Sequence, residues 1–139
     1  MAVQSNIGVV RKFYDLLNAG DVEGAAAVLS PGYSEQYGGP PGMPSGVPGF
    51  KAFVSMLAGA FPDLHVEVHD VFGEGDRVAA RLTVSGTHRG LFMGTIQPTG
   101  KHAVWEGIDI FRLRDSRIIE RWNSRDLLGL MRQLGAVGG

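Results

Sequence analysis

The N-terminal third of the chain carries apolar residues at helical spacing. They recur every three or four positions over 6–17, and the segment 18–20 closes this run with a glycine suited to a left-handed helix cap. Asp21 is suited to cap a second, alanine-rich helix that we expect to run through Leu29. The spacing over 50–61 predicts a third amphipathic helix.

The second half of the chain alternates apolar and polar residues, which is typical of half-buried strands. Four such segments are present: 64–69, 78–87, 103–113 and 118–124. Turn residues separate them, and a short helix over 126–133 follows, with Asp126 suited to cap it and Gly135 after its end. Helices followed by an antiparallel meander predict the α+β class, with residues 1–139 as one domain. A bent sheet of this kind usually encloses a pocket against its helices.

The segment 38–49 is rich in glycine and proline, so neither a helix nor a central strand is expected there. A domain linker is one interpretation. The residues before it are too few to bury a core of their own, which favours a loop across the mouth of a pocket.

Composition excludes several classes of function. The 139 residues carry a formal net charge of −1, whereas a nucleic-acid binder needs a basic surface. The chain has no cysteine, which excludes disulfides and thiolate nucleophiles and suits a reducing cytoplasm. No apolar run approaches the roughly 18 residues of a membrane helix. We therefore expect a cytoplasmic protein that binds a small molecule, without nucleic acid, membrane or metal.

His65, Glu67 and His69 project from one face of a predicted strand. Two imidazoles and a carboxylate can bind zinc or iron, but no further ligand is obviously placed to complete a site. The alternative is a polar strand face that is exposed or lies at a subunit contact.

Asp109 shares a predicted strand face with Trp105, Gly107 and Phe111. A carboxylate among aromatic rings could act as a general base, as in ketosteroid isomerase. The alternative is a structural ion pair with an arginine such as Arg121 or Arg112.

Other candidates lie at strand ends and on the third helix. His88 falls where a strand passes into a loop, so it is either functional or a turn-capping residue. Phe53 and Met56 are core residues by default, and their inner ends could also form a cavity wall.

Several stretches resemble the SnoaL-like polyketide cyclase family. They cover nearly the whole chain: FYDLLNAGD at 13–21, FPDL at 61–64, GEGDRVAARLTVSGTHRG at 73–90, PTGK at 98–101, and GIDIFRLRDSRIIERWNSRDLLGLMRQLG at 107–135. The resemblance implies the cone-shaped α+β barrel of nuclear transport factor two, with the helices packed in a curved antiparallel sheet, and a homodimer or homotetramer. It also implies ring closure of a polyketide ester by intramolecular aldol condensation, without a cofactor.

The resemblance also implies site residues. Asn123 falls where the family has its acid/base aspartate, and Asp109 falls where it has a pocket histidine. An amide cannot abstract a proton at neutral pH, but it can donate a hydrogen bond to an enolate oxygen. Asp109 is then the expected base, with His88 and Asn123 orienting the substrate or stabilising the oxyanion. The expected substrate contacts are Tyr14, Tyr33, Glu35, Tyr37, Phe53, Met56, Trp105 and Phe111.

Two alternatives to a cyclase remain at this point. One is a hydroxylase-like or epoxide-hydrolase-like enzyme on the same scaffold. The other is a non-catalytic pocket protein, which the amide at Asn123 favours. A second copy is expected on the outer face of the sheet, where the His65, Glu67 and His69 face could take part.

Overall fold

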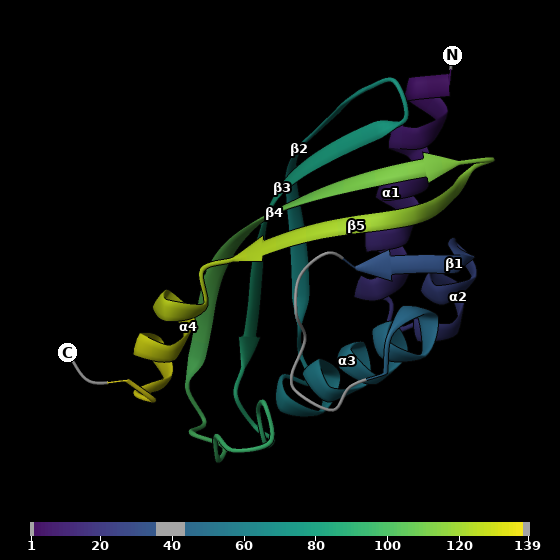
Figure 1. Cartoon of the computed structure of the whole chain (residues 1–139). Helices are drawn as coiled ribbons and strands as arrows, with labels where there is room; N and C mark the ends of the chain where they lie inside the picture. The colour runs from purple at the N-terminus through teal and green to yellow at the C-terminus, as the bar shows by residue number, and fades with distance from the viewer. Residues whose placement is uncertain (1, 36–43, 138–139) are drawn as a thin grey trace.

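The computed structural model describes residues 2–35 and 44–137, and within them the chain folds into a curved sheet with helices (Figure 1). The elements in chain order are α1 (Ala2–Asn18), α2 (Val22–Ala27), β1 (Leu29–Glu35), α3 (Gly46–Ala60), β2 (His65–Glu74), β3 (Arg77–Thr87), β4 (His102–Arg114), β5 (Arg117–Arg125) and α4 (Leu127–Leu134). None of the described helices is long and apolar enough to cross a membrane. The α+β class expected from the sequence is confirmed.

The five strands lie in the order β1-β5-β4-β3-β2. The predicted antiparallel meander is confirmed as β2 to β5. The sheet is strongly curved but open, with β1 and β2 at its edges (Figure 1). In that view α1, α2 and α3 lie on one side of the sheet, and α4 lies beside β4 near the C-terminus.

The sequence analysis missed β1, which pairs in parallel with β5. We expected the second helix to extend through Leu29, but α2 ends at Ala27 and Leu29 already begins β1. The strand contains Pro31 and Gly32, and its register shifts between Leu29 and Ser34. Proline and glycine are tolerated in this way at the edge of a sheet and at bulges.

The predicted helix ends are confirmed by their capping groups. The side chain of Asp21 accepts a hydrogen bond from the backbone N–H of Gly24, and Asp126 accepts one from Gly129 in the same way. Gly20 and Gly135 both have a positive φ, at 75° and 76°. Of the glycine- and proline-rich segment, residues 38–43 lie outside the described residues, so its expected position over a pocket stays a prediction. The expectation that the segment forms no helix is wrong for 46–49, because α3 begins at Gly46. Pro48 lies in the first turn of α3, where its missing N–H would have no intrahelical partner.

The two faces of the sheet differ in burial. Alternate residues of β3 and β4 are buried on the concave face, where they pack against aromatic side chains of α1 and α3. The convex face bears several exposed apolar side chains, namely Phe72, Val104, Ile108 and Ile110. The concave face therefore holds the core, and the convex face is available to a partner.

Candidate functional site

Asp109 lies on the concave face of β4, as its alternation with Trp105, Gly107 and Phe111 predicts. Its side chain is fully buried, although an isolated buried carboxylate is costly. The neighbouring positions across the sheet are Ala80 on β3 and Asn123 on β5. Asp109 is thus held in the middle of the sheet, and its charge must be compensated by contacts within the protein.

Among the described residues, two arginines and one tyrosine stabilise this charge. Arg125 binds both carboxylate oxygens, with Nη1 at 2.7 Å from Oδ1 and Nη2 at 3.2 Å from Oδ2. Arg121 Nη2 lies 3.2 Å from Oδ2, and the hydroxyl of Tyr14 on α1 donates a hydrogen bond to the same oxygen. Of the two arginines that the sequence suggested, Arg121 is a partner. Arg112 instead pairs with Glu120, 2.8 Å away.

These contacts decide the protonation state of Asp109. Burial by itself would raise the pKa of Asp109, but the charges of Arg121 and Arg125 and the hydrogen bonds outweigh it, so the pKa is lowered. A carboxylate with a lowered pKa and four incoming hydrogen bonds is a weak proton acceptor. The geometry therefore favours the ion-paired role of Asp109 over that of a general base.

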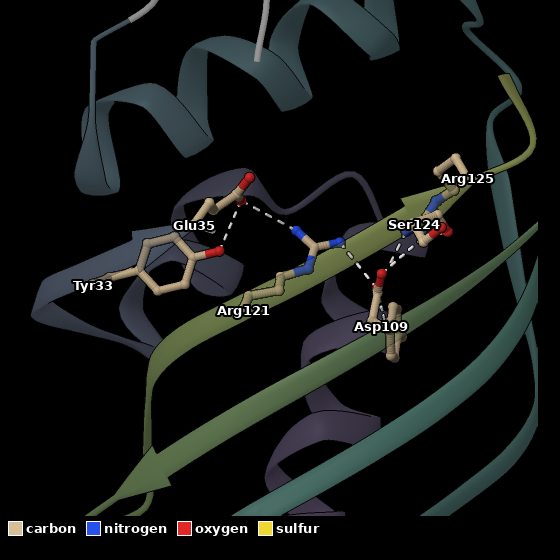
Figure 2. Close-up of polar contacts among 7 residues, drawn as sticks. Tyr33, Glu35, Asp109, Arg121, Ser124 and Arg125 are labelled. Carbon is tan, nitrogen blue, oxygen red and sulfur yellow. Dashed lines mark hydrogen bonds and ion pairs between the residues drawn. The ribbon is translucent and has the colours of Figure 1, made fainter. Parts of the chain in front are cut away.

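Arg121 extends the network to β1. Its Nη1 lies 3.4 Å from Oε1 of Glu35, and the hydroxyl of Tyr33 donates to the same oxygen at 2.7 Å. Figure 2 shows the guanidinium of Arg121 between the carboxylates of Glu35 and Asp109, with Arg125 on the far side of Asp109. Two carboxylates and two guanidiniums thus form one network without net charge.

Aromatic rings surround the buried Arg121. Its guanidinium carbon lies 5.4 Å from the ring centre of Phe13 and 5.8 Å from that of Phe111, within cation–π range. Burial raises the pKa of both Tyr14 and Tyr33, and the adjacent carboxylates raise it further. Both phenols therefore remain protonated hydrogen-bond donors throughout the neutral range.

Asn123 lies directly opposite Asp109 in the antiparallel pair, so the two side chains share the concave face. Its side chain is partly exposed. Among the described residues none forms a hydrogen bond with its amide. The amide is thus able to donate to a bound molecule.

His88 lies apart from this network. Its backbone N–H donates to the carbonyl of Lys101. Lys101 precedes Asp109 by eight positions, and eight residues of extended strand span about 26 Å. The ring is fully buried beside Phe61 and Phe92, with centroid distances of 5.4 and 6.3 Å. The structure thus brings together Asp109 and Asn123 but not His88.

Thr99 fixes the tautomer of His88. The backbone N–H of Thr99 donates to Nδ1 at 3.2 Å, so the neutral ring carries its proton on Nε2. Nε2 has no hydrogen-bond partner among the described residues.

The expected substrate contacts fall into groups. Tyr14, Tyr33, Trp105 and Phe111 are buried and contact other aromatic side chains, while Phe53 and Met56 are half-buried on α3. Glu35 belongs to the network described above. Tyr37 lies outside the described residues.

Sequence reasoning missed Arg125. The sequence held only part of the signal: Arg121, Asn123 and Arg125 alternate along one strand and so share a face. That this face meets Asp109 follows from the register of β5 against β4. A metal site at His65, Glu67 and His69 has no support, since the described residues contain no metal-binding group of His, Cys, Asp or Glu. The ring of His69 instead lies 2.7 Å from the hydroxyl of Thr83.

Comparison with known proteins finds polyketide cyclases that match nearly the whole length of this chain. The model of the SnoaL-like polyketide cyclase family matches residues 7–134. The aklanonic acid methyl ester cyclase DnrD of Streptomyces peucetius is 30% identical, over 96% of this chain and 92% of that protein.

Solved structures share this fold. AclR of Streptomyces galilaeus, a candidate hydroxylase, superposes with a TM-score of 0.86 at 28% identity, over 99% of this chain and 85% of its own. TsrD of Streptomyces laurentii superposes with a TM-score of 0.85 at 33% identity, over 96% of this chain and 97% of its own. Because the family model spans nearly the whole chain, the chain belongs to the SnoaL-like polyketide cyclase family.

Proposed function

We propose that the chain closes a ring in a polyketide ester by intramolecular aldol addition, in the cytoplasm and without a cofactor. A base removes a proton next to one carbonyl, and the resulting enolate carbon attacks a second carbonyl. No electrons are exchanged with another molecule, so this acid/base chemistry can be done by side chains alone. Family membership and the cyclase relative support this reaction over the hydroxylase-like and non-catalytic alternatives.

The observation that carries the proposal is the amide of Asn123 beside a fully compensated ionic network on the concave face. In this proposal Asn123 donates a hydrogen bond to the enolate oxygen as charge develops there. Arg121 and Arg125 are both paired with Asp109, so these side chains give the amide and the substrate a fixed polar wall. His88 is remote from this wall and keeps, in this proposal, a supporting role at the other end of the sheet.

The experiment uses aklanonic acid methyl ester, the compound in the name of the DnrD relative. Ring closure is an isomerisation, so the product has the mass of the substrate and is separated from it by chromatography. We expect product with the wild-type protein and at least a tenfold lower kcat for Asn123→Leu, which removes the amide. Binding of the ester without any product would favour the non-catalytic alternative.

We also propose a second copy of the chain as the partner of the convex face. Phe72, Ala79, Ile110 and Trp122 form one row across four strands, because each pairs with the next in register. The adjacent row is charged and carries both signs, in Glu74, Arg77, Arg112 and Glu120. An apolar row beside charges of both signs is suited to a self-complementary two-fold contact.

A further inference from the structure

The ionic network contains a second carboxylate, Glu35, whose surroundings differ from those of Asp109. We propose that Glu35 is the proton acceptor of the cyclisation, and this inference rests on the proposed function. This proposal rests on a comparison of the two carboxylates. Asp109 is fully buried, whereas the side chain of Glu35 is 20% exposed.

The hydrogen bonds to the two carboxylates are also distributed differently. Both oxygens of Asp109 accept from guanidinium or phenol donors. On Glu35 the donors Tyr33 and Arg121 both bind Oε1, and none of the described residues donates to Oε2. Oε2 therefore retains the lone pairs that a base needs, on a side chain that a substrate can reach.

The contacts to Oε1 hold the carboxylate in one orientation. Tyr33 and Glu35 are two positions apart on β1 and so share a face, and the ring of Tyr33 packs on Phe50 of α3 at 6.3 Å. Arg121 is the register partner of Glu35 on β5. Among the described residues, Tyr33 and Arg121 are the titratable groups in contact with Glu35.

Glu35 and Asn123 are placed to act on one carbonyl group. Asn123 follows Arg121 by two positions on β5, which corresponds to about 6.6 Å along the strand. Because Arg121 is the register partner of Glu35, the carboxylate of Glu35 and the amide of Asn123 belong to neighbouring positions of two paired strands. In this proposal the substrate lies over both, with the carbon that loses its proton at Oε2 of Glu35 and the carbonyl oxygen at the amide of Asn123.

The step balances without any other reactant. Oε2 of Glu35 takes the proton from the carbon next to the carbonyl, and the electron pair of the broken C–H bond forms the enolate. The enolate carbon attacks a second carbonyl carbon, which forms the C–C bond and leaves an alkoxide. The carboxylic acid of Glu35 then returns its proton to the alkoxide oxygen.

The test compares kcat and substrate affinity of Glu35→Gln and of wild type with aklanonic acid methyl ester. Glutamine keeps an oxygen that accepts from Tyr33 but cannot take a proton. We expect kcat to fall by about 10²- to 10⁴-fold, with the dissociation constant of the ester within threefold of wild type. Glu35→Asp should recover part of the activity. The acidic limb of the pH profile of kcat should disappear in Glu35→Gln.

The matched control is Glu23→Gln on α2, where an exposed glutamate pairs only with Lys51 among the described residues. Its kcat should equal that of wild type. If Glu35→Gln retains kcat within threefold, or keeps the acidic limb, the assignment of the base is overturned while the cyclase function stands. If the wild-type protein binds the ester and forms no product, the proposed function fails and the base role with it.

Discussion

Gln133 of α4 takes the place that a neighbouring strand would have beside Val104 of β4. Its Oε1 accepts from the backbone N–H of Val104 at 2.8 Å, and its Nε2 donates to the carbonyl of Val104 at 2.7 Å. The pairing of β5 with β4 has already ended, at Arg125 and Gly107. One side chain therefore satisfies strand groups that β5 leaves unpaired, and it anchors the C-terminal helix to the sheet.

Replacing Gln133 by alanine should destabilise the fold modestly. Both hydrogen bonds to Val104 are lost, but water can reach the exposed backbone groups, so we expect a loss of about 1 kcal/mol. Urea unfolding measures this as a lower midpoint with an unchanged slope. Arg132→Ala, the neighbouring exposed position, should change stability by less than about 0.5 kcal/mol. Equal effects of the two variants would contradict the anchoring role.

Asp109→Asn should be far more damaging. It removes the charge that compensates Arg121 and Arg125, both of which are largely buried, so we expect a loss of about 3–5 kcal/mol. Asp70→Asn is the control, since Asp70 forms a 2.7 Å ion pair with Arg81 in which both side chains are about half exposed. That variant should cost less than about 1 kcal/mol by urea unfolding. If Asp109→Asn and Asp70→Asn lowered the unfolding free energy by similar amounts, the buried network would add little to stability.

The stability of the protein should also depend on acid pH through Asp109. Its pKa is lower in the folded state than the roughly 3.9 of an unfolded aspartate, so the stabilisation is complete above that value. It is lost as the pH falls through the folded-state pKa. Hydrogen bonds from Thr87 also lower the pKa of Asp63, so Asp63 adds a pH dependence of its own. The unfolding free energy is therefore measured in the Asp63→Asn variant, which removes that contribution. We expect its unfolding free energy in urea to decrease further below about pH 4, and a flat profile there would refute the assignment.

Local patterns predicted most of the fold. Alternation gave the four strands of the meander, and Asp21, Asp126 and Gly135 marked helix ends because capping depends on neighbours in the chain. The pattern failed at β1, where Pro31 and Gly32 obscure the alternation and pairing with the distant β5 creates the strand. Tertiary context there outweighs local preference.

The candidate site was predictable only in part. Periodicity showed that Asp109 faces the concave side, but not which charges meet it there. That depends on the register of β5 against β4, which turns Arg121 and Arg125 toward Asp109. Periodicity also did not show that His88 lies far from Asp109. That distance follows from the hydrogen bond between the backbone of His88 and that of Lys101.

Disrupting the convex apolar row should separate the proposed dimer. Ile110→Glu buries a carboxylate in that row if two copies meet there, and burial of an unpaired charge is unfavourable. Sedimentation velocity at micromolar concentration should show a dimer for wild type and a monomer for Ile110→Glu. Ser55→Glu adds the same charge on an exposed position of α3 and should remain dimeric. A monomeric wild-type protein would contradict the proposed interface.

Gly107 makes room for the ion pair between Arg125 and Asp109. A Cβ at this position would lie 2.5 Å from Nη1 and 2.6 Å from Cδ of Arg125, and 2.8 Å from the carbonyl oxygen of Ser124. Gly107→Ala should therefore displace Arg125 and cost about 1–3 kcal/mol in urea unfolding. Gly8→Ala on α1 is the control, because a Cβ there meets no atom within 4 Å and alanine favours the helix. It should stabilise the protein by up to about 1 kcal/mol.

A double-mutant cycle separates this displacement from simple crowding at Gly107. In an Arg125→Ala background the guanidinium is absent, so Gly107→Ala meets only the carbonyl of Ser124 and should cost less than it does in wild type. The difference measures how strongly the two positions are coupled through the ion pair with Asp109. Additive costs would mean that backbone crowding by Ser124 explains the whole effect. A coupling above about 0.5 kcal/mol would instead show that glycine at 107 is needed because Arg125 lies across it to reach Asp109.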